Sequence, residues 1–281
     1  MVYEERYEVM SQIGAGGMSQ VYRVWDHRLQ KEWALKKTIA DTPEKRQAFV
    51  RESMLLKQIT HPGIPFLVDS FEEGEACFIV MEYIRGESLK QYLNRKRNMP
   101  VRQTLQVMDT ILDTLSYLHR LPVPVVYSDL KPANIMLQKE FGGKLIDFGS
   151  VRSGTEAAQM GTLEYAAPEQ LVKTANSIVD PRSDIYSFGV VCYEMLTGDK
   201  FNGTYLENPF IPEYLRNVLF QCTRSSRKKR FQTMEEVREA INKGQQRKTG
   251  WHWPVKRREP FLLQELERVV LYDLQERNEE G

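Results

Sequence analysis

The chain has 281 residues, of which 41% are hydrophobic and 27% are charged, a composition that is ordinary for a folded globular protein. Lys and Arg number 39 against 38 Asp and Glu, so no global electrostatic field points to nucleic acid or to a membrane surface. Cys77, Cys192 and Cys222 lie far apart in the sequence. This spacing favours reduced thiols over a disulfide framework or a metal site.

The sequence shows no targeting segment. The first ten residues, MVYEERYEVM, are charged from the fourth residue onward and contain no apolar core, so no signal peptide is expected. The longest apolar stretch, FGVVCYEML at 188–196, is interrupted by Glu194 and is too short to span a bilayer. We therefore expect a cytoplasmic protein without a transmembrane segment.

Strand patterns dominate the beginning of the chain. Residues 7–39 alternate apolar and polar positions around a glycine cluster, and they predict a hairpin followed by a third strand. Residues 43–59 place apolar side chains at helical spacing between a proline and the sequence His-Pro-Gly, and they predict a helix. Residues 66–83 return to strand character, with the sequence EEGE as the turn.

The character of the sequence changes near Gly86. Residues 89–97 and 104–120 predict two helices, and the pattern is mostly helical up to about residue 243. We therefore predict an α+β fold with two lobes, a small β-rich lobe at residues 1–86 and a larger, mainly helical lobe at residues 87–243. Residues 244–281 predict a basic linker followed by an amphipathic helix at 260–277.

Several weak signals follow one another in a suggestive order. The sequence IGAGGMSQVY at 13–22 offers glycines whose backbone N–H groups can approach phosphate oxygens, although Ser19 stands where a third glycine of G-x-G-x-x-G would be. Alone, this segment is most simply a glycine-rich hairpin turn. Lys36 on the next strand and Glu52 on the next helix would, by themselves, be ordinary solvated charges. The motifs that come after them are Asp129-x-Lys131-x-x-Asn134, Asp147-Phe148-Gly149 and Ala167-Pro168-Glu169.

This order meets the needs of phosphoryl transfer, which requires held phosphates, a neutralising metal and an oriented acceptor hydroxyl. Lys36 would hold the α- and β-phosphates, and Glu52 would hold Lys36 by an ion pair. Asp147 and Asn134 carry the oxygen ligands that Mg²⁺ prefers. Asp129 would accept the proton of the hydroxyl.

The complete set resembles the eukaryotic-like protein kinase family over residues 7–243, and in style it is closest to the bacterial Ser/Thr kinases. The resemblance implies a bilobal kinase fold that transfers the γ-phosphoryl group of ATP to Ser/Thr hydroxyls of protein substrates. Mg²⁺ is the metal that this family uses, and Mn²⁺ could substitute for it. Lys131, and the sequence GTLEYAAPE with Thr162, are similar to the Ser/Thr-specific form of the family.

The resemblance also assigns individual residues. Met81 resembles the residue at the back of the adenine pocket, and Glu82, Tyr83 and Ile84 resemble the hinge whose backbone binds adenine. The expected nucleotide-binding residues are Ile13, Gly14, Ala15, Gly16, Gly17, Val21, Ala34, Lys36, Glu52, Met81, Glu82, Ile84 and Met136, the metal ligands are Asn134 and Asp147, and the catalytic residues are Asp129 and Lys131. Two structural contacts are also implied, between Glu169 and Arg230 and between Asp184 and the backbone of the catalytic loop.

Tyr127 and Ser128 depart from the family, which has a histidine and an arginine at these positions. Tyr127 is expected to pack against Phe148, where an aromatic ring preserves the chemistry. Ser128 carries no charge and therefore cannot bind a phosphate on the activation segment as the arginine does. We predict little dependence on activation-loop phosphorylation. Phosphorylation at Ser150, Ser153, Thr155 or Thr162 stays open, and Arg152 could pair with a phosphate on one of them.

Two other classes of function stay open. A nucleotide-binding pseudokinase scaffold is disfavoured because the polar set is complete, and a small-molecule phosphotransferase is disfavoured by GTLEYAAPE, a sequence typical of peptide docking. The basic run at 224–231 is interpreted as solvated charge and not as a nucleic-acid site, since the net charge is balanced. The helix at 260–277 would pack on the same chain, bind a partner or mediate self-association.

Overall fold

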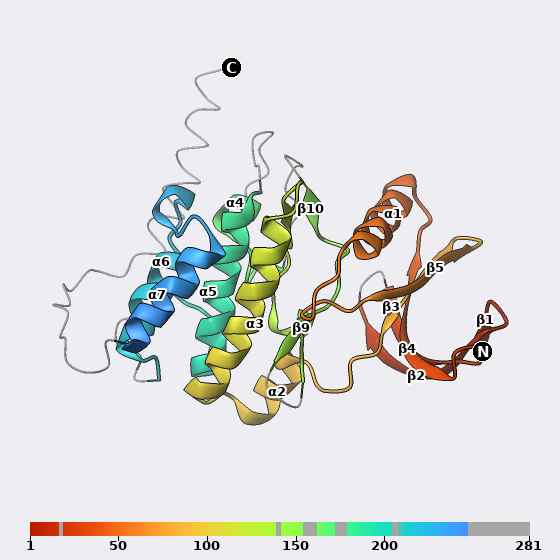
Figure 1. Cartoon of the computed structure of the whole chain (residues 1–281), viewed down its shortest axis with the longest axis horizontal. Helices are drawn as coiled ribbons and strands as arrows, with labels where there is room; N and C mark the ends of the chain where they lie inside the picture. The colour runs from red at the N-terminus through yellow and green to blue at the C-terminus, as the bar shows by residue number, and fades with distance from the viewer. Residues whose placement is uncertain are drawn as a thin grey trace, which may run out of the picture.

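The computed structural model describes residues 1–16, 19–138, 142–153, 162–171, 179–203, 208 and 210–246. Figure 1 shows a lobe made mainly of strands beside a lobe made mainly of helices, which confirms the predicted α+β, bilobal architecture. Gly17, Thr155 and the helix predicted at 260–277 lie outside the described residues. No helix within the described part of the chain combines the length and the apolar character needed to cross a membrane.

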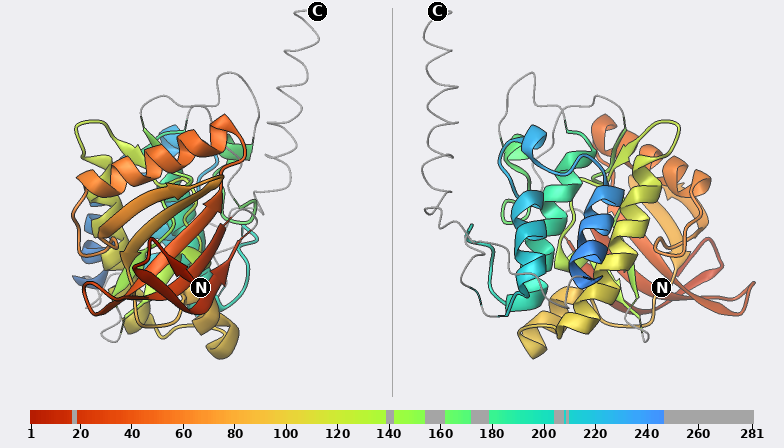
Figure 2. Two further views of the ribbon diagram at one scale, coloured as in Figure 1. Left: turned by 90° about the vertical axis from the view of Figure 1, so that its right-hand side faces the viewer. Right: turned by 60° about the vertical axis from the view of Figure 1, so that its left-hand side comes forward.

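The first lobe contains a six-stranded antiparallel sheet in the order β1-β2-β3-β4-β6-β5. Its strands are β1 (Val2–Tyr3), β2 (Tyr7–Ala15), β3 (Ser19–Asp26), β4 (Lys31–Ile39), β5 (Leu67–Glu73) and β6 (Ala76–Glu82). The helix α1 (Pro43–Gln58) contacts β5 and β6, and the left view of Figure 2 shows it beside the curved sheet. Helix α1 begins where the sequence predicts, because the side chain of Thr42 accepts a hydrogen bond from the N–H of Lys45.

The two faces of this sheet serve different cores. Successive side chains of a strand point to opposite faces, so Leu35 of β4 and Val80 of β6 join a small core inside the first lobe. Their neighbours Ala34 and Met81 join the large core, which continues into the helical lobe. The face that carries Ala34 and Met81 is therefore the one turned toward the second lobe.

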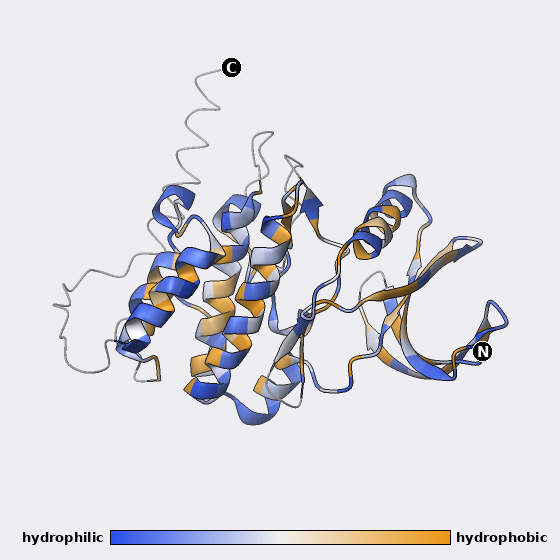
Figure 3. Cartoon of the chain, viewed as in Figure 1, coloured by the Kyte–Doolittle hydropathy of each residue, from blue (hydrophilic) through white to orange (hydrophobic). Residues whose placement is uncertain are grey.

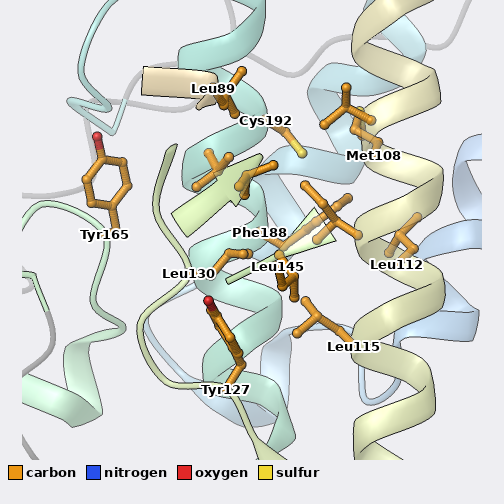
Figure 4. Packing of buried hydrophobic residues seen from close by; sticks show 14 of the residues in the cluster. Leu89, Met108, Leu112, Leu115, Tyr127, Leu130, Leu145, Tyr165, Phe188 and Cys192 are labelled. Atoms are coloured by element: carbon orange, nitrogen blue, oxygen red, sulfur yellow. The ribbon is translucent and has the colours of Figure 1, made fainter. Parts of the chain in front are cut away.

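Helices of the second lobe pack around a largely apolar interior. They are α2 (Leu89–Lys96), α3 (Val101–His119), α4 (Pro168–Leu171), α5 (Pro181–Thr197), α6 (Glu213–Cys222) and α7 (Met234–Gln246), with 3-10 turns η1 (Pro132–Asn134) and η2 (Arg227–Lys229). Figure 3 shows that the apolar residues of α3 and α5 gather where these helices lie side by side. In Figure 4, Met108 and Leu112 of α3 and Phe188 and Cys192 of α5 lie in this interior.

Helix α5 is the central support of this lobe, since every residue from Ser183 to Thr197 is buried. It starts at Asp180, whose side chain accepts a hydrogen bond from the N–H of Arg182 at 2.9 Å, and Pro181 follows in the first turn. It ends at Gly198, which takes the left-handed conformation with φ of 75°. These caps place Asp184 deep in the lobe, beneath the loop that carries the catalytic motif.

Four short strands build the region between the helices. They are β7 (Val125–Val126), β8 (Ile135–Leu137), β9 (Gly143–Leu145) and β10 (Arg152–Ser153), paired as β8-β9 and β10-β7. The linker between the lobes passes close to β8, because a Cβ added at Gly86 would lie 2.2 Å from the carbonyl oxygen of Leu137. Only glycine allows this approach without a shift of the backbone.

All three cysteines are free and buried, with exposures of 1% for Cys77 and 0% for Cys192 and Cys222. Burial raises the pKa of each thiol. The prediction of reduced thiols without a disulfide framework agrees with this arrangement.

Candidate active site

Lys36 connects the two lobes by ion pairs. Its ammonium nitrogen lies 2.8 and 3.0 Å from the carboxylate oxygens of Glu52 on α1. The same nitrogen lies 2.7 Å from Oδ1 of Asp147, which belongs to the second lobe. Lys36 and Glu52 are 7% and 5% exposed, so this contact is shielded from water. The predicted Lys36–Glu52 ion pair is confirmed, and it extends to Asp147.

The charges of Lys36 and Asp147 stabilise each other, whereas burial and the charge of Asp147 raise the pKa of Glu52. Burial acts to lower the pKa of Lys36, but the carboxylates of Glu52 and Asp147 outweigh burial and raise it. Burial likewise acts to raise the pKa of Asp147, and the ammonium group of Lys36 reverses the effect and lowers it. Lys36 is therefore a protonated cation held beside an ionised carboxylate.

Gly149 keeps open the space beside these charges. A Cβ added there would lie 3.4 Å from each of three polar atoms, Oδ1 of Asp147, Oε2 of Glu52 and Nζ of Lys36. The third residue of the Asp147-Phe148-Gly149 motif thus leaves the polar group accessible on that side.

A second polar group surrounds Asp129. Nζ of Lys131 lies 2.7 Å from Oδ2 of Asp129, and the amide nitrogen of Asn134 donates to the main-chain oxygen at 3.0 Å and to Oδ2 at 3.1 Å. The hydroxyl of Thr162 donates to Oδ1 of Asp129 at 3.1 Å and accepts from Lys131 at 2.9 Å. The carboxylate of Asp129 therefore already accepts a hydrogen bond from one hydroxyl group.

Asp184 of α5 holds the backbone of the loop that carries Asp129. Its carboxylate accepts hydrogen bonds from the main-chain N–H groups of Tyr127 and Ser128, both at 2.8 Å, and it lies 2.8 Å from Nε2 of His119. Asp184 is 0% exposed. The contact expected between Asp184 and the catalytic-loop backbone is confirmed, and so is the pair of Glu169 with Arg230, at 2.6 Å.

Tyr127 fills the place expected of it. Its ring meets that of Phe148 edge to face, with 5.4 Å between centroids, and its hydroxyl donates to the carbonyl oxygen of Ile146. In Figure 4 the Tyr127 side chain lies in the apolar interior near Leu130. Burial raises the pKa of Tyr127 well above its ordinary value, so the hydroxyl stays protonated and can donate. The predicted packing on Phe148 is confirmed.

Three of the residues expected around adenine, Val21, Ala34 and Met81, lie on neighbouring strands of the first lobe. Val21 of β3 stands opposite Lys36 of β4, and Ala34 of β4 stands opposite Met81 of β6. Met136 lies on β8 in the other lobe. Ile13, Gly14 and Ala15 lie on β2, and Gly16 follows it, with its N–H donating to the carbonyl oxygen of Ser19 at 2.8 Å.

Lys144 contacts Glu82, one of the expected nucleotide-binding residues, and the sequence analysis did not identify it. Its ammonium group lies 2.5 Å from Oε2 of Glu82, so an ion pair joins β9 to the end of β6, where the hinge is expected to begin. In the β8-β9 hairpin, Lys144 stands opposite Met136. The side chains are 12% and 22% exposed for Lys144 and Glu82. Arg85, which follows the expected hinge, contacts Glu32 of β4 at 3.1 Å.

The segment after Gly149 is described only in part. Arg152 is 6% exposed and donates to the carbonyl oxygen of Val151, and Ser150 is partly buried. The Thr162 hydroxyl is partly buried and is engaged by Asp129 and Lys131.

The comparison with known families decides the assignment: the family described as "Protein kinase domain" matches residues 7–244. The chain belongs to the protein kinase domain family. This family assignment covers both polar groups described above and most of both lobes.

Bacterial serine/threonine-protein kinases are among the curated relatives of this kinase chain. It is 36% identical over 207 residues to the probable serine/threonine-protein kinase SCO3848 of Streptomyces coelicolor, covering 68% of this chain and 30% of that protein. It is 34% identical over 234 residues to the serine/threonine-protein kinase PknB of Mycobacterium leprae, covering 78% of this chain and 36% of that protein. It is 29% identical over 259 residues to the serine/threonine-protein kinase PrkC of Bacillus subtilis, covering 83% of this chain and 39% of that protein. The kinase chain thus spans about a third of the length of these relatives.

Proposed function

We propose that this protein transfers the γ-phosphoryl group of ATP to Ser or Thr hydroxyls of protein substrates. The observation that carries the proposal is the hydroxyl of Thr162, which lies 3.1 Å from the carboxylate of Asp129 and 2.9 Å from the ammonium group of Lys131. A base and a cation that already bind one hydroxyl are suited to bind the hydroxyl of a substrate. The names of the relatives, all serine/threonine-protein kinases, support this choice of acceptor.

The residues present fit a magnesium nucleotide. Asp147 offers a carboxylate whose side chain is 45% exposed, and the amide nitrogen of Asn134 is turned to Asp129, which leaves its amide oxygen for a cation. Within the described ranges no three His, Cys, Asp or Glu side chains gather as a metal site. Mg²⁺ is usually held by one or two protein ligands together with phosphates and water, and Asp147 and Asn134 would be these two ligands. Mn²⁺ accepts the same oxygen ligands.

Each residue then has a role that its contacts support. Bound Mg²⁺ would neutralise phosphate charge. Lys36, kept protonated by Glu52 and Asp147, would bind phosphate oxygens, and the main-chain N–H groups near Gly16 would approach them from the glycine-rich turn. Asp129 would accept the proton of the acceptor hydroxyl, and Lys131 would stabilise the negative charge that develops between them.

We also propose that this activity needs little activation-loop phosphorylation. Ser128 is 8% exposed, is uncharged and donates to the carbonyl oxygen of Val126, so it offers no cation to a phosphate. Asp129, Lys131 and Thr162 are in contact in the unmodified chain. Replacing Ser150, Ser153 and Thr155 together by alanine is expected to leave activity within about threefold, and a loss of orders of magnitude would contradict the proposal.

The activity itself is tested with labelled ATP, Mg²⁺ and a generic basic protein, with the native chain and Asp129→Asn side by side. The substitution keeps the size of the side chain and removes the base. We expect incorporation to fall by at least about a hundredfold. Equal incorporation by both chains would favour a nucleotide-binding scaffold. In a second assay with added small hydroxylated molecules, label found on them and not on the protein would favour a small-molecule phosphotransferase. Self-association through residues 260–277 stays a separate prediction, tested by sedimentation with and without that segment.

A further inference from the structure

Gln170 of α4 joins the end of the activation segment to the catalytic loop. Its amide nitrogen donates a hydrogen bond to the carbonyl oxygen of Ser128 at 2.8 Å, and its amide oxygen accepts one from the N–H of Ala167 at 2.9 Å. Gln170 is 2% exposed. A carbonyl group can only accept and an N–H group can only donate, so these two partners fix which way the amide faces.

The residue held in this way has a costly backbone conformation. Ser128 has φ of 66°, the left-handed region that residues other than glycine seldom adopt. Such a conformation persists when the surrounding contacts hold it. Asp184 accepts from the N–H of Ser128, and Gln170 donates to its carbonyl group. The peptide groups on both sides of Ser128 are therefore fixed by buried side chains, directly before Asp129.

We propose that Gln170 is the positioning residue that orients Asp129 in the unphosphorylated chain. Its hydrogen bonds connect the activation segment to the catalytic loop, as an ion pair between a phosphate on that segment and a cation at position 128 would otherwise do. The inference rests on the proposed kinase function and adds its regulation. Thr162 also reaches Asp129 from the activation segment, but it touches the reacting carboxylate itself. Gln170 instead acts through the backbone of Ser128, and its hydrogen bond is available without modification.

A simpler interpretation is that Gln170 only caps α4. Its amide oxygen does serve the N–H of Ala167, and a side chain three residues into a helix often binds the N–H that precedes the helix. That interpretation needs only the oxygen of the amide. It gives no role to the hydrogen bond from the nitrogen to Ser128, whose two groups are both buried.

Three variants separate these interpretations. Gln170→Glu keeps an acceptor for the N–H of Ala167 but, when ionised, has no donor for the carbonyl group of Ser128. Gln170→Met keeps the approximate length and removes both hydrogen bonds. Ser183→Ala is the matched control, because the Ser183 hydroxyl donates to Oε1 of Glu169 at 2.8 Å and so supports α4 without touching the catalytic loop.

The full chain is treated with phosphatase and assayed for kcat and for the KM of ATP, and amide hydrogen exchange is followed in peptides that cover residues 127–130. We expect kcat to fall about tenfold in both Gln170 variants, since a buried carbonyl group loses its donor, while the KM of ATP stays within about twofold. Exchange at residues 127–130 should become faster in both. Ser183→Ala should keep kcat within about twofold and leave this exchange unchanged.

Several results would overturn the inference. Native kcat and exchange in folded Gln170→Glu would show that the cap alone matters. An equal loss of kcat in Ser183→Ala would show general loosening of α4. Loss of native activity after phosphatase treatment would show that a phosphate positions Asp129. A native chain that transfers no phosphate overturns the proposed function and not this inference, which the exchange comparison then decides.

Discussion

Tyr127 donates its hydroxyl hydrogen to the carbonyl oxygen of Ile146, while the edge of its ring meets Phe148. The tyrosine that replaces the family's histidine therefore supports the segment that leads to Asp147 in two ways, by packing and by a buried hydrogen bond. The departure from the family pattern is compensated by contacts within the same interior.

Removal of the Tyr127 hydroxyl should cost stability while leaving catalysis nearly intact. In Tyr127→Phe the carbonyl group of Ile146 loses its donor, and we expect the free energy of unfolding to fall by about 1–2 kcal/mol. Tyr127→Ala also loses the ring, and we expect a fall of about 3–5 kcal/mol. Tyr22→Phe is the control, because its hydroxyl bonds to Gln20 at the surface. Urea denaturation measures all three, and equal effects of the two phenylalanine variants would contradict the prediction.

Lys36→Met should remove activity and destabilise the fold for separate reasons. The buried carboxylate of Glu52 would lose its cation, which typically costs about 3–5 kcal/mol. The double variant Lys36→Met with Glu52→Leu removes the stranded charge, and we expect most of the stability to return without any return of activity. Thermal unfolding and the labelled-ATP assay measure the two effects. Activity in the double variant would mean that Lys36 has no part in the chemistry.

Gly86→Ala should disturb the connection between the lobes, because the new Cβ would lie 2.2 Å from the carbonyl oxygen of Leu137. We expect a loss of about 1–3 kcal/mol in the free energy of unfolding and a higher KM for ATP. Gly74→Ala is the matched control, since Gly74 has φ of 60° and nothing within 4 Å of an added Cβ. Its expected cost, about 1 kcal/mol, comes from backbone conformation alone, and its KM for ATP should stay native. A higher KM in both variants would refute the local explanation.

Asp26 should make the stability of the first lobe depend on pH in the acidic range. Burial acts to raise the pKa of Asp26, but the hydrogen bonds from Arg6, from the N–H groups of Leu29 and Arg28 and from Trp33 outweigh it and lower the pKa to about 2. A carboxylate whose pKa is lower in the folded state than in the unfolded state stabilises the fold above pH 4. That stabilisation, about 2 kcal/mol, is lost as the pH falls from about 4 to 2.

The matching measurement compares native chain and Asp26→Asn by urea denaturation between pH 7 and pH 2.5. The variant should be less stable by about 2 kcal/mol at pH 7, and the difference should shrink below pH 4. A difference that stays constant over this range would show that Asp26 acts by packing and not by its charge.

Much of the fold was predictable because its signals are local. The helix at 43–58 is marked by a cap, a proline and an apolar period, and Lys36 and Glu52 each lie in a recognisable element. The helix expected at 104–120 instead spans Val101–His119 and starts directly after Pro100, with Val101 and Leu105 already packed against the core. Strands such as β7, with two residues, are too short to show any period.

Contacts between distant residues were not predictable in the same way. Lys144 and Glu82 are 62 residues apart, and Gln170 and Ser128 are 42 apart. None of the four lies in a motif whose spacing indicates its partner, and which partner a long side chain reaches is decided by packing in three dimensions. The Asp147 end of the Lys36 network was expected to bind metal, and its direct ion pair with Lys36 became evident only in the structure.

The complete burial of Cys77, Cys192 and Cys222 makes the molecule a convenient host for spectroscopic labels. Thiolates, not thiols, attack maleimides and iodoacetamides, and all three native thiols are shielded and have raised pKa values. One cysteine introduced at an exposed position of each lobe would therefore take up a dye pair without prior removal of the native residues. Opening and closing of the lobes then becomes measurable by energy transfer in the otherwise unaltered chain.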